Sequence, residues 1–203
     1  MPDSYSKKIE TAFSTGQLCV GIDPHAELLL DNGFEDSLVG LKSFSFAMLD
    51  AISESAAIVK PQVAFYERFG AKGLLVLEEL LSEASKRKLF VIADAKRGDI
   101  GSTMQGYADA WLSKDAPFLC DALTVSPYLG VGAMETVVST AIDRNKGLFV
   151  LAATSNREAA TIQSAQRNGK TIAELVAEEV QNLNQVATNS NGKYGNLGLV
   201  IGA

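Results

Sequence analysis

Short runs of apolar residues alternate along the chain with longer stretches whose apolar positions recur every three or four residues. The short runs predict six β-strands, at residues 18–23, 57–63, 89–94, 122–126, 147–153 and 197–202. Their hydrophobicity is nearly continuous, without polar alternation, as expected for parallel strands that are covered on both faces.

The longer stretches predict amphipathic helices between these strands, at residues 43–55, 71–87, 103–112, 134–144 and 171–186. A leading helix over residues 4–13 is expected to close the bottom of the structure. Alternating strands and helices indicate an α/β fold with a parallel sheet. A (β/α)₈ TIM barrel and an open doubly wound sheet both fit this alternation.

Two observations favour the barrel. Polar and charged side chains recur at the C-terminal ends of several strands, where barrel enzymes carry their active sites. The first strand is not followed by the Gly-x-Gly-x-x-Gly turn of a dinucleotide-binding sheet. Because a barrel has eight strands and the chain stops at an apolar strand, we expect one barrel domain over residues 1–203, with about six of the strands and an incomplete C-terminus.

Composition narrows the class of protein. The 203 residues are 47% hydrophobic and carry a formal net charge of −6, which suits one soluble domain and disfavours nucleic-acid binding. No apolar run approaches the roughly 20 residues of a membrane span. The N-terminus lacks the pattern of an export signal, so a cytoplasmic protein is expected. Cys19 and Cys120 lie in apolar strand-like runs and are expected to be buried free thiols.

The most informative segment follows the third apolar run. Strand side chains alternate between faces, so Asp94 and Lys96 are expected to project to the same side. Burying such charges is costly unless they pair, and buried clusters of this kind are frequent at functional sites. A structural salt bridge at a strand end is the alternative interpretation.

Other strand ends add charges to this cluster. The first apolar run ends at Asp23, the second carries Lys60, and Asp99 lies just beyond Lys96. Lysine and aspartate thus alternate over Lys60, Asp94, Lys96 and Asp99, and opposite neighbours favour the ionised forms. Such a network can hold an ammonium group against a developing negative charge.

These motifs resemble those of a known family. Segment 94–100, DAKRGDI, resembles the Asp-x-Lys-x-x-Asp signature of the orotidine 5′-phosphate decarboxylase family. The flanking motifs resemble its longer bacterial branch: 21–24 GIDP, 60–62 KPQ, 126–130 SPYLG and 154–156 TSN. Five motifs in order at successive strand ends make the resemblance specific.

The resemblance implies decarboxylation of orotidine 5′-monophosphate to uridine 5′-monophosphate in pyrimidine biosynthesis, without a cofactor or metal. Lys96 matches the lysine that stabilises the C6 carbanion and protonates it, and Asp94 matches the carboxylate beside the departing group. Lys60 matches the lysine that orders the network and contacts the ribose. Asp23 matches an acid that binds a ribose hydroxyl, and Ser155 matches a serine that reads the pyrimidine edge.

The resemblance also implies a homodimer with shared sites, because Asp99, Ile100 and Thr103 match residues that reach the neighbouring subunit's site. In the family, loops after the last two strands hold the substrate phosphate. We expect these phosphate-binding loops to lie beyond the six strands of this chain. Without them, the 203 residues are expected to have little or no activity.

Alternatives remain open at this stage. Ketogulonate-phosphate decarboxylase and hexulose-phosphate synthase resemble this family but use Mg²⁺, with a glutamate where this chain has Lys60. A truncated, inactive relative that acts only as a dimerising or structural chain is another possibility. His25 can be imagined as a general base, but a loop residue near the site is the favoured interpretation. The polar stretch 156–169 is a candidate mobile lid.

Overall fold

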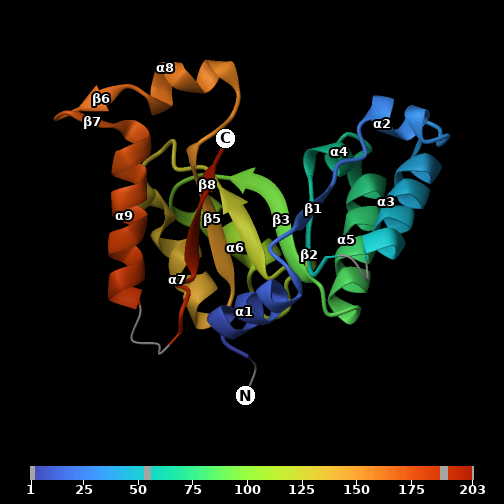
Figure 1. Cartoon of the computed structure of the whole chain (residues 1–203), viewed down its shortest axis with the longest axis horizontal. Coiled ribbons are helices and arrows are strands. Elements are labelled where there is room, and N and C mark those ends of the chain that lie inside the picture. Colours follow the sequence, from blue (N-terminus) through green and yellow to red (C-terminus); the bar gives the residue numbers. More distant parts are fainter. Residues whose placement is uncertain (1–2, 53–55, 188–191, 203) are drawn as a thin grey trace.

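Six parallel strands form one curled sheet in the computed structural model, which describes residues 3–52, 56–187 and 192–202 (Figure 1). The strands are β1 (Cys19–Ile22), β2 (Ile58–Pro61), β3 (Phe90–Arg97), β4 (Ala122–Val125), β5 (Gly147–Ala153) and β8 (Leu197–Ile201). They are hydrogen-bonded in that order, and every pairing is parallel. The six predicted strands are therefore confirmed, and their C-terminal ends all lie at the same end of the sheet.

Amphipathic helices cover the outer face of this sheet. The longer ones are α3 (Leu38–Ile52), α5 (Gly70–Lys86), α6 (Gly101–Trp111), α7 (Glu135–Asp143) and α9 (Ile172–Ala187). The main hydrophobic core lies between them and the sheet, and includes Val59, Val91, Leu123 and Leu148. These residues alternate along their strands with residues of the inner face, which is the face that carries Asp94.

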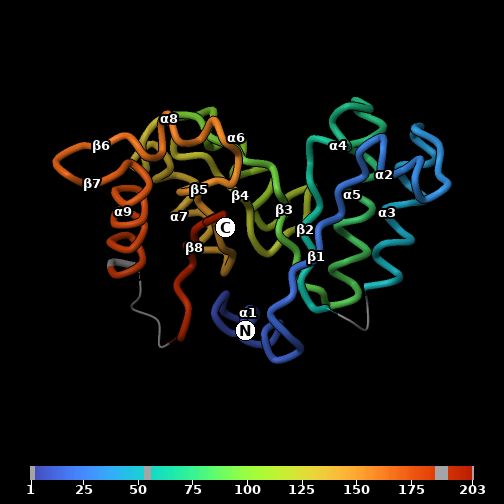
Figure 2. The backbone as a smooth tube through the Cα atoms, turned by 45° about the horizontal axis from the view of Figure 1, so that its top comes forward, coloured from blue at the N-terminus to red at the C-terminus, as the bar shows by residue number. Residues whose placement is uncertain are grey.

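The leading helix α1 (Tyr5–Thr15) closes the end at which the strands begin, as predicted. Figures 1 and 2 both place it beneath the sheet, at the end opposite to α8 (Ala160–Gln163). Its buried residues form a second core with Phe90 and Ile92 of β3, and the rings of Tyr5 and Phe90 lie 5.9 Å apart, edge to face. The inner face of the sheet is therefore apolar at its lower end.

Several short elements were not predicted. They are α2 (Ala26–Asp31), α4 (Ala64–Glu67), α8, the 3₁₀ turns η1 (Val131–Met134) and η2 (Arg157–Ala159), and the hairpin strands β6 (Gln166–Arg167) and β7 (Lys170–Thr171). Each is too short to show a helical or strand period. The end of the helix predicted over 43–55 and the terminal residue 203 lie outside the described residues.

The prediction that both cysteines are buried is wrong for Cys19. Cys120 is buried, but Cys19 is exposed. The reason is its position on β1, which pairs only with β2 among the described strands and so forms an edge of the sheet. Apolar sequence neighbours cannot distinguish an edge strand from a central one.

Candidate active site

One carboxylate, that of Asp94, is surrounded by hydrogen-bond donors on the inner face of the sheet, near the C-terminal ends of the strands. Asp94 Oδ1 lies 2.8 Å from Lys96 Nζ and accepts a second hydrogen bond of 2.8 Å from the hydroxyl of Thr124. Its other oxygen, Oδ2, lies 3.1 Å from Lys60 Nζ. The residue is only 7% exposed, so three donors from β2, β3 and β4 converge on a nearly buried charge.

The backbone of β3 departs from regular strand geometry at this point. Ala93 pairs with Leu123 and Arg97 pairs with Val125, so β3 contains a bulge between these two positions. Lys96, inside the bulge, has a φ of 49°, in the left-handed region that lysine seldom adopts. Bulges next to active sites commonly redirect a side chain. Here the bulge brings the ammonium of Lys96 back onto Asp94.

The charges around Asp94 decide its ionisation. Burial alone would raise the pKa of this carboxyl group, but the hydrogen bond from Lys96, the charge of Lys60 and the Thr124 hydroxyl outweigh it. The net result is a pKa below the usual value for aspartate. Asp94 is therefore an anion at neutral pH, between two lysines.

Two members of this network were missed as site residues by the sequence reasoning. Gln62 accepts a hydrogen bond of 3.2 Å from Lys96 Nζ, and Gln62 also forms an isolated β-bridge with Asp94. Thr124 accepts a hydrogen bond of 2.8 Å from the Lys96 amide. Gln62 stood in a recognised motif, whereas a threonine in an apolar run carries no signal that distinguishes it from a core residue.

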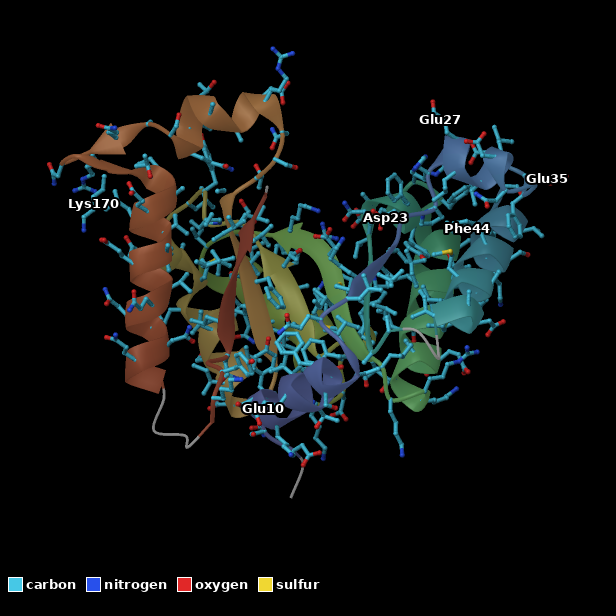
Figure 3. The ribbon with its side chains drawn as sticks, in the orientation of Figure 1. Glu10, Asp23, Glu27, Glu35, Phe44 and Lys170 are labelled. Carbon is cyan, nitrogen blue, oxygen red and sulfur yellow. The ribbon has the colours of Figure 1, made fainter. Side chains whose placement is uncertain are left out.

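Asp23 lies directly after β1, at the same end of the sheet (Figure 3). Its Oδ1 is buried and accepts no hydrogen bond from the described residues. A buried carboxylate oxygen without a donor is unusual and needs an explanation. The residue as a whole is half-buried, so its carboxylate group reaches the surface at this end of the sheet.

The remaining predicted residues lie outside the Asp94 network. Asp99 accepts a hydrogen bond of 2.8 Å from the Ile100 amide, and no salt bridge joins it to another described residue. Ile100 and Thr103 are exposed at the start of α6, and Ser155 is exposed after β5. Within one chain, the alternating network thus contains Lys60, Asp94 and Lys96 but not Asp99.

A pocket of about 540 Å³ lies beside the ends of β4 and β5, and Ser126, Thr154, Ile162 and Gln163 are among the residues that line it. Gln163 of α8 accepts a hydrogen bond of 2.7 Å from the Thr154 amide, which ties the segment 156–169 to the end of β5. Lid motion in this segment stays a prediction. His25 caps α2 through its Nδ1, which accepts a hydrogen bond from the Leu28 amide, in agreement with its interpretation as a loop residue.

The described residues contain no cluster of three or more His, Cys, Asp or Glu side chains that could hold a metal ion. No helix in the same part of the chain is both long and apolar enough to span a bilayer.

Residues 16–203 match the model of the orotidine 5′-phosphate decarboxylase / HUMPS family. The chain belongs to this family. It is 48% identical over 202 residues to the orotidine 5′-phosphate decarboxylase of Corynebacterium glutamicum, an alignment that covers 98% of the chain and 72% of that protein. It is 47% identical to the Streptomyces coelicolor protein of the same name, over 93% of the chain and 66% of that protein.

Solved structures of the family agree. A Streptomyces avermitilis protein described as an orotidine 5′-phosphate decarboxylase superposes with a TM-score of 0.94 at 45% identity, over 100% of the chain and 70% of that protein. The Leishmania donovani OMP decarboxylase superposes with a TM-score of 0.79 at 29% identity, over 98% of the chain and 70% of that protein. The predicted TIM-barrel fold class is thereby confirmed, as is the family resemblance that the five motifs indicated.

Proposed function

We propose that the chain catalyses the decarboxylation of orotidine 5′-monophosphate to uridine 5′-monophosphate, a step of pyrimidine biosynthesis. The observation that carries this proposal is the placement of the Lys96 ammonium, 2.8 Å from the nearly buried anion of Asp94. The names of the relatives at 47–48% identity support the same reaction.

The reaction needs a cation near one carbon atom. When the bond between C6 and the carboxylate breaks, carbon dioxide leaves and the electron pair stays on C6. A fixed ammonium group stabilises this charge more effectively than mobile water, because no dipoles need to reorganise. Lys96 is the stabilising cation, and it then donates a proton to C6 and regains one from solvent.

The neighbours of Lys96 keep it in place. Asp94 holds the ammonium by an ion pair and lies beside the departing carboxylate. Lys60 binds the other oxygen of Asp94, at 3.1 Å, and also contacts the ribose. Enzymes lower barriers by about 8–23 kcal/mol, so this cation acts together with binding energy from remote parts of the substrate.

Two further residues bind the nucleotide. The half-buried carboxylate of Asp23, directly after β1, accepts a hydrogen bond from a ribose hydroxyl. Ser155, exposed after β5, reads the edge of the pyrimidine. Both lie where strands end, which is the edge that carries active sites in barrel enzymes.

The active form is a homodimer in which Asp99, Ile100 and Thr103 reach the neighbouring subunit's site. In support, Ile100 is 61% exposed, and Tyr128 and Leu129 of the adjacent loop are 76% and 52% exposed. Apolar side chains grouped at one end of the sheet are typical of a protein interface. Ile100→Asp is expected to shift the sedimentation coefficient from dimer to monomer, whereas Ile162→Asp, at an exposed position of α8, leaves it unchanged.

The magnesium-dependent members of the family are the second candidate class. They need an oxygen ligand where this chain has Lys60, and the Lys60 ammonium is engaged with Asp94. A cation at this position repels Mg²⁺, which binds oxygen ligands. This arrangement favours the metal-independent reaction.

The test is formation of uridine 5′-monophosphate from orotidine 5′-monophosphate, followed by chromatography, with the chelator EDTA present. Turnover that EDTA does not affect supports the proposal. Absence of turnover contradicts it. Mg²⁺-dependent turnover of a ketogulonate or hexulose phosphate instead assigns the chain to the second class.

A further inference from the structure

Thr124 connects Asp94 and Lys96 of β3 from the neighbouring strand. Its hydroxyl donates a hydrogen bond of 2.8 Å to Asp94 Oδ1 and accepts one of 2.8 Å from the Lys96 amide. The residue is 2% exposed, in the middle of β4. Both the donor and an acceptor site of this hydroxyl are thus used within the active-site network.

The hydrogen bond to the Lys96 amide compensates for the bulge. Between the pairs Ala93–Leu123 and Arg97–Val125, the regular ladder of β3 and β4 is interrupted. A backbone amide in such a bulge loses its ladder partner, and an unsatisfied buried donor is costly. The Thr124 side chain takes the place of the missing carbonyl and holds Lys96 in its left-handed conformation, at φ 49°.

We propose that Thr124 is a positioning residue for decarboxylation, which fixes the Lys96 backbone and the Asp94 carboxylate relative to each other. This inference rests on the proposed function. Thr124 is too buried to touch the substrate and therefore acts through its two neighbours. Small errors in the placement of a catalytic group lower the rate strongly. Loss of the Thr124 hydrogen bonds is therefore expected to lower kcat rather than to change KM.

Two substitutions separate the hydroxyl from the shape of the side chain. Thr124→Val keeps the branched shape and removes the hydroxyl, whereas Thr124→Ser keeps the hydroxyl and removes the methyl group. We expect Thr124→Val to lower kcat roughly 10- to 100-fold, the effect of an unsatisfied buried polar group on the barrier. Thr124→Ser is expected to retain kcat within about threefold. KM is expected to change little in either variant.

A control removes a similar hydroxyl elsewhere. Thr140 of α7 donates a hydrogen bond of 2.9 Å to the Thr136 carbonyl, far from the Asp94 network in the chain. Thr140→Val is expected to leave kcat unchanged. Thr124→Ala provides a second variant without the hydroxyl, should Thr124→Val fail to fold.

The ionisation of Asp94 provides a readout that does not depend on turnover. The groups that face this carboxylate are Lys60 from β2 and Lys96 from β3, while Cys19 and Asp23 of the β1 segment lie on the same inner face. None of these is altered by Thr124→Val. Loss of one hydrogen bond to the anion raises the pKa of Asp94, measured by carbon-13 NMR of the side-chain carboxyl group.

The outcomes distinguish the two proposals. An inactive wild-type chain contradicts the proposed function, while the NMR titration still tests the role of Thr124. A lowered kcat and raised Asp94 pKa in Thr124→Val, both restored in Thr124→Ser, support the inference. Unchanged kcat in the folded valine or alanine variant, or equal losses in Thr124→Ser and Thr124→Val, overturns it.

Discussion

The ammonium of Lys96 lies 2.8 Å from the carboxylate of Asp94, two positions earlier on the same strand. This ion pair does not arise from strand alternation alone, because Lys96 lies in a bulge with its backbone in the left-handed region. Backbone strain of this kind costs about 1–3 kcal/mol and persists only where surrounding contacts enforce it. Here Thr124 accepts a hydrogen bond from the Lys96 amide, and Gln62 holds the ammonium at the end of the side chain.

The first prediction concerns the cation itself. Lys96→Ala removes the group that stabilises and protonates C6, and we expect kcat for orotidine 5′-monophosphate to fall by a factor of at least about 1000. Lys86→Ala, at a 71% exposed side chain of α5, is the matched control and is expected to keep wild-type kcat. Normal turnover in Lys96→Ala would refute the mechanism given above.

The second prediction separates ligand binding from folding at Asp23. Asp23 Oδ1 accepts no hydrogen bond from the described residues, so Asp23→Ala removes no hydrogen bond of this atom from the folded protein. We expect binding of uridine 5′-monophosphate, measured by calorimetry, to weaken about 10-fold or more. The free energy of unfolding is expected to change by less than about 1 kcal/mol.

Asp31→Ala, at an exposed position of α2, serves as the control for removal of an acidic side chain. It is expected to bind the nucleotide like the wild type. Equal losses of affinity in the two variants would assign the effect to net charge rather than to a ribose contact.

The third prediction concerns a buried polar pair outside the Asp94 network. Ser45 Oγ of α3 and the Tyr66 hydroxyl of α4 lie 2.9 Å apart, and both residues are 0% exposed. Tyr66→Phe leaves the serine hydroxyl without this partner and is expected to lower the free energy of unfolding by about 1–2 kcal/mol. Urea denaturation measures this change.

A double-mutant cycle provides the check. Ser45→Ala combined with Tyr66→Phe is expected to cost less than the sum of the single changes, because neither polar group is then left unpaired. Ser43→Ala, at an exposed position of α3, is expected to change stability little. Strict additivity of the pair would mean that the hydrogen bond contributes nothing.

The fourth prediction uses the contrast between the cysteines. Burial raises the pKa of Cys120 to about 12, and burial also raises that of Cys19, where the charge of Lys60 partly opposes it. Only thiolates react with iodoacetamide, and Cys19 is the exposed one. At pH 8 we expect mass spectrometry to find Cys19 alkylated well before Cys120.

Cys19→Ser should abolish the early labelling, and added urea should expose Cys120 in the unfolded chain. Raising the pH increases the thiolate fraction and thus the rate at Cys19, since its pKa is above the usual value. Early labelling of Cys120 in the folded protein would contradict the buried position given to this residue.

The strands, the longer helices and the central ion pair could all be predicted because each has a local signature. Continuous apolar runs indicated the parallel sheet, and Asp94 with Lys96 stood out as charges at the end of such a run. The motif order predicted the family, which the comparisons confirm.

The parts that escaped prediction depend on contacts between distant segments. The bulge in β3 is visible only against the register of β4, and the role of Thr124 follows from that bulge. The exposure of Cys19 depends on which strands neighbour β1. Within one chain Asp99 lies outside the Asp94 network and accepts a hydrogen bond from the Ile100 amide, so its place in a site shared between two subunits stays a prediction.

Because α1 packs beneath the sheet, substitutions at the two ends of the strands are expected to have different effects: loss of folding near α1 and loss of activity near Asp94. Tyr5 packs against Phe90 there, at the opposite end of β3 from Lys96. In a scan of all positions scored for both abundance and growth without added pyrimidine, changes at the lower end should reduce both scores. Changes in the Asp94 network should preserve abundance while growth fails, so the two scores together would locate the active site without any knowledge of the substrate.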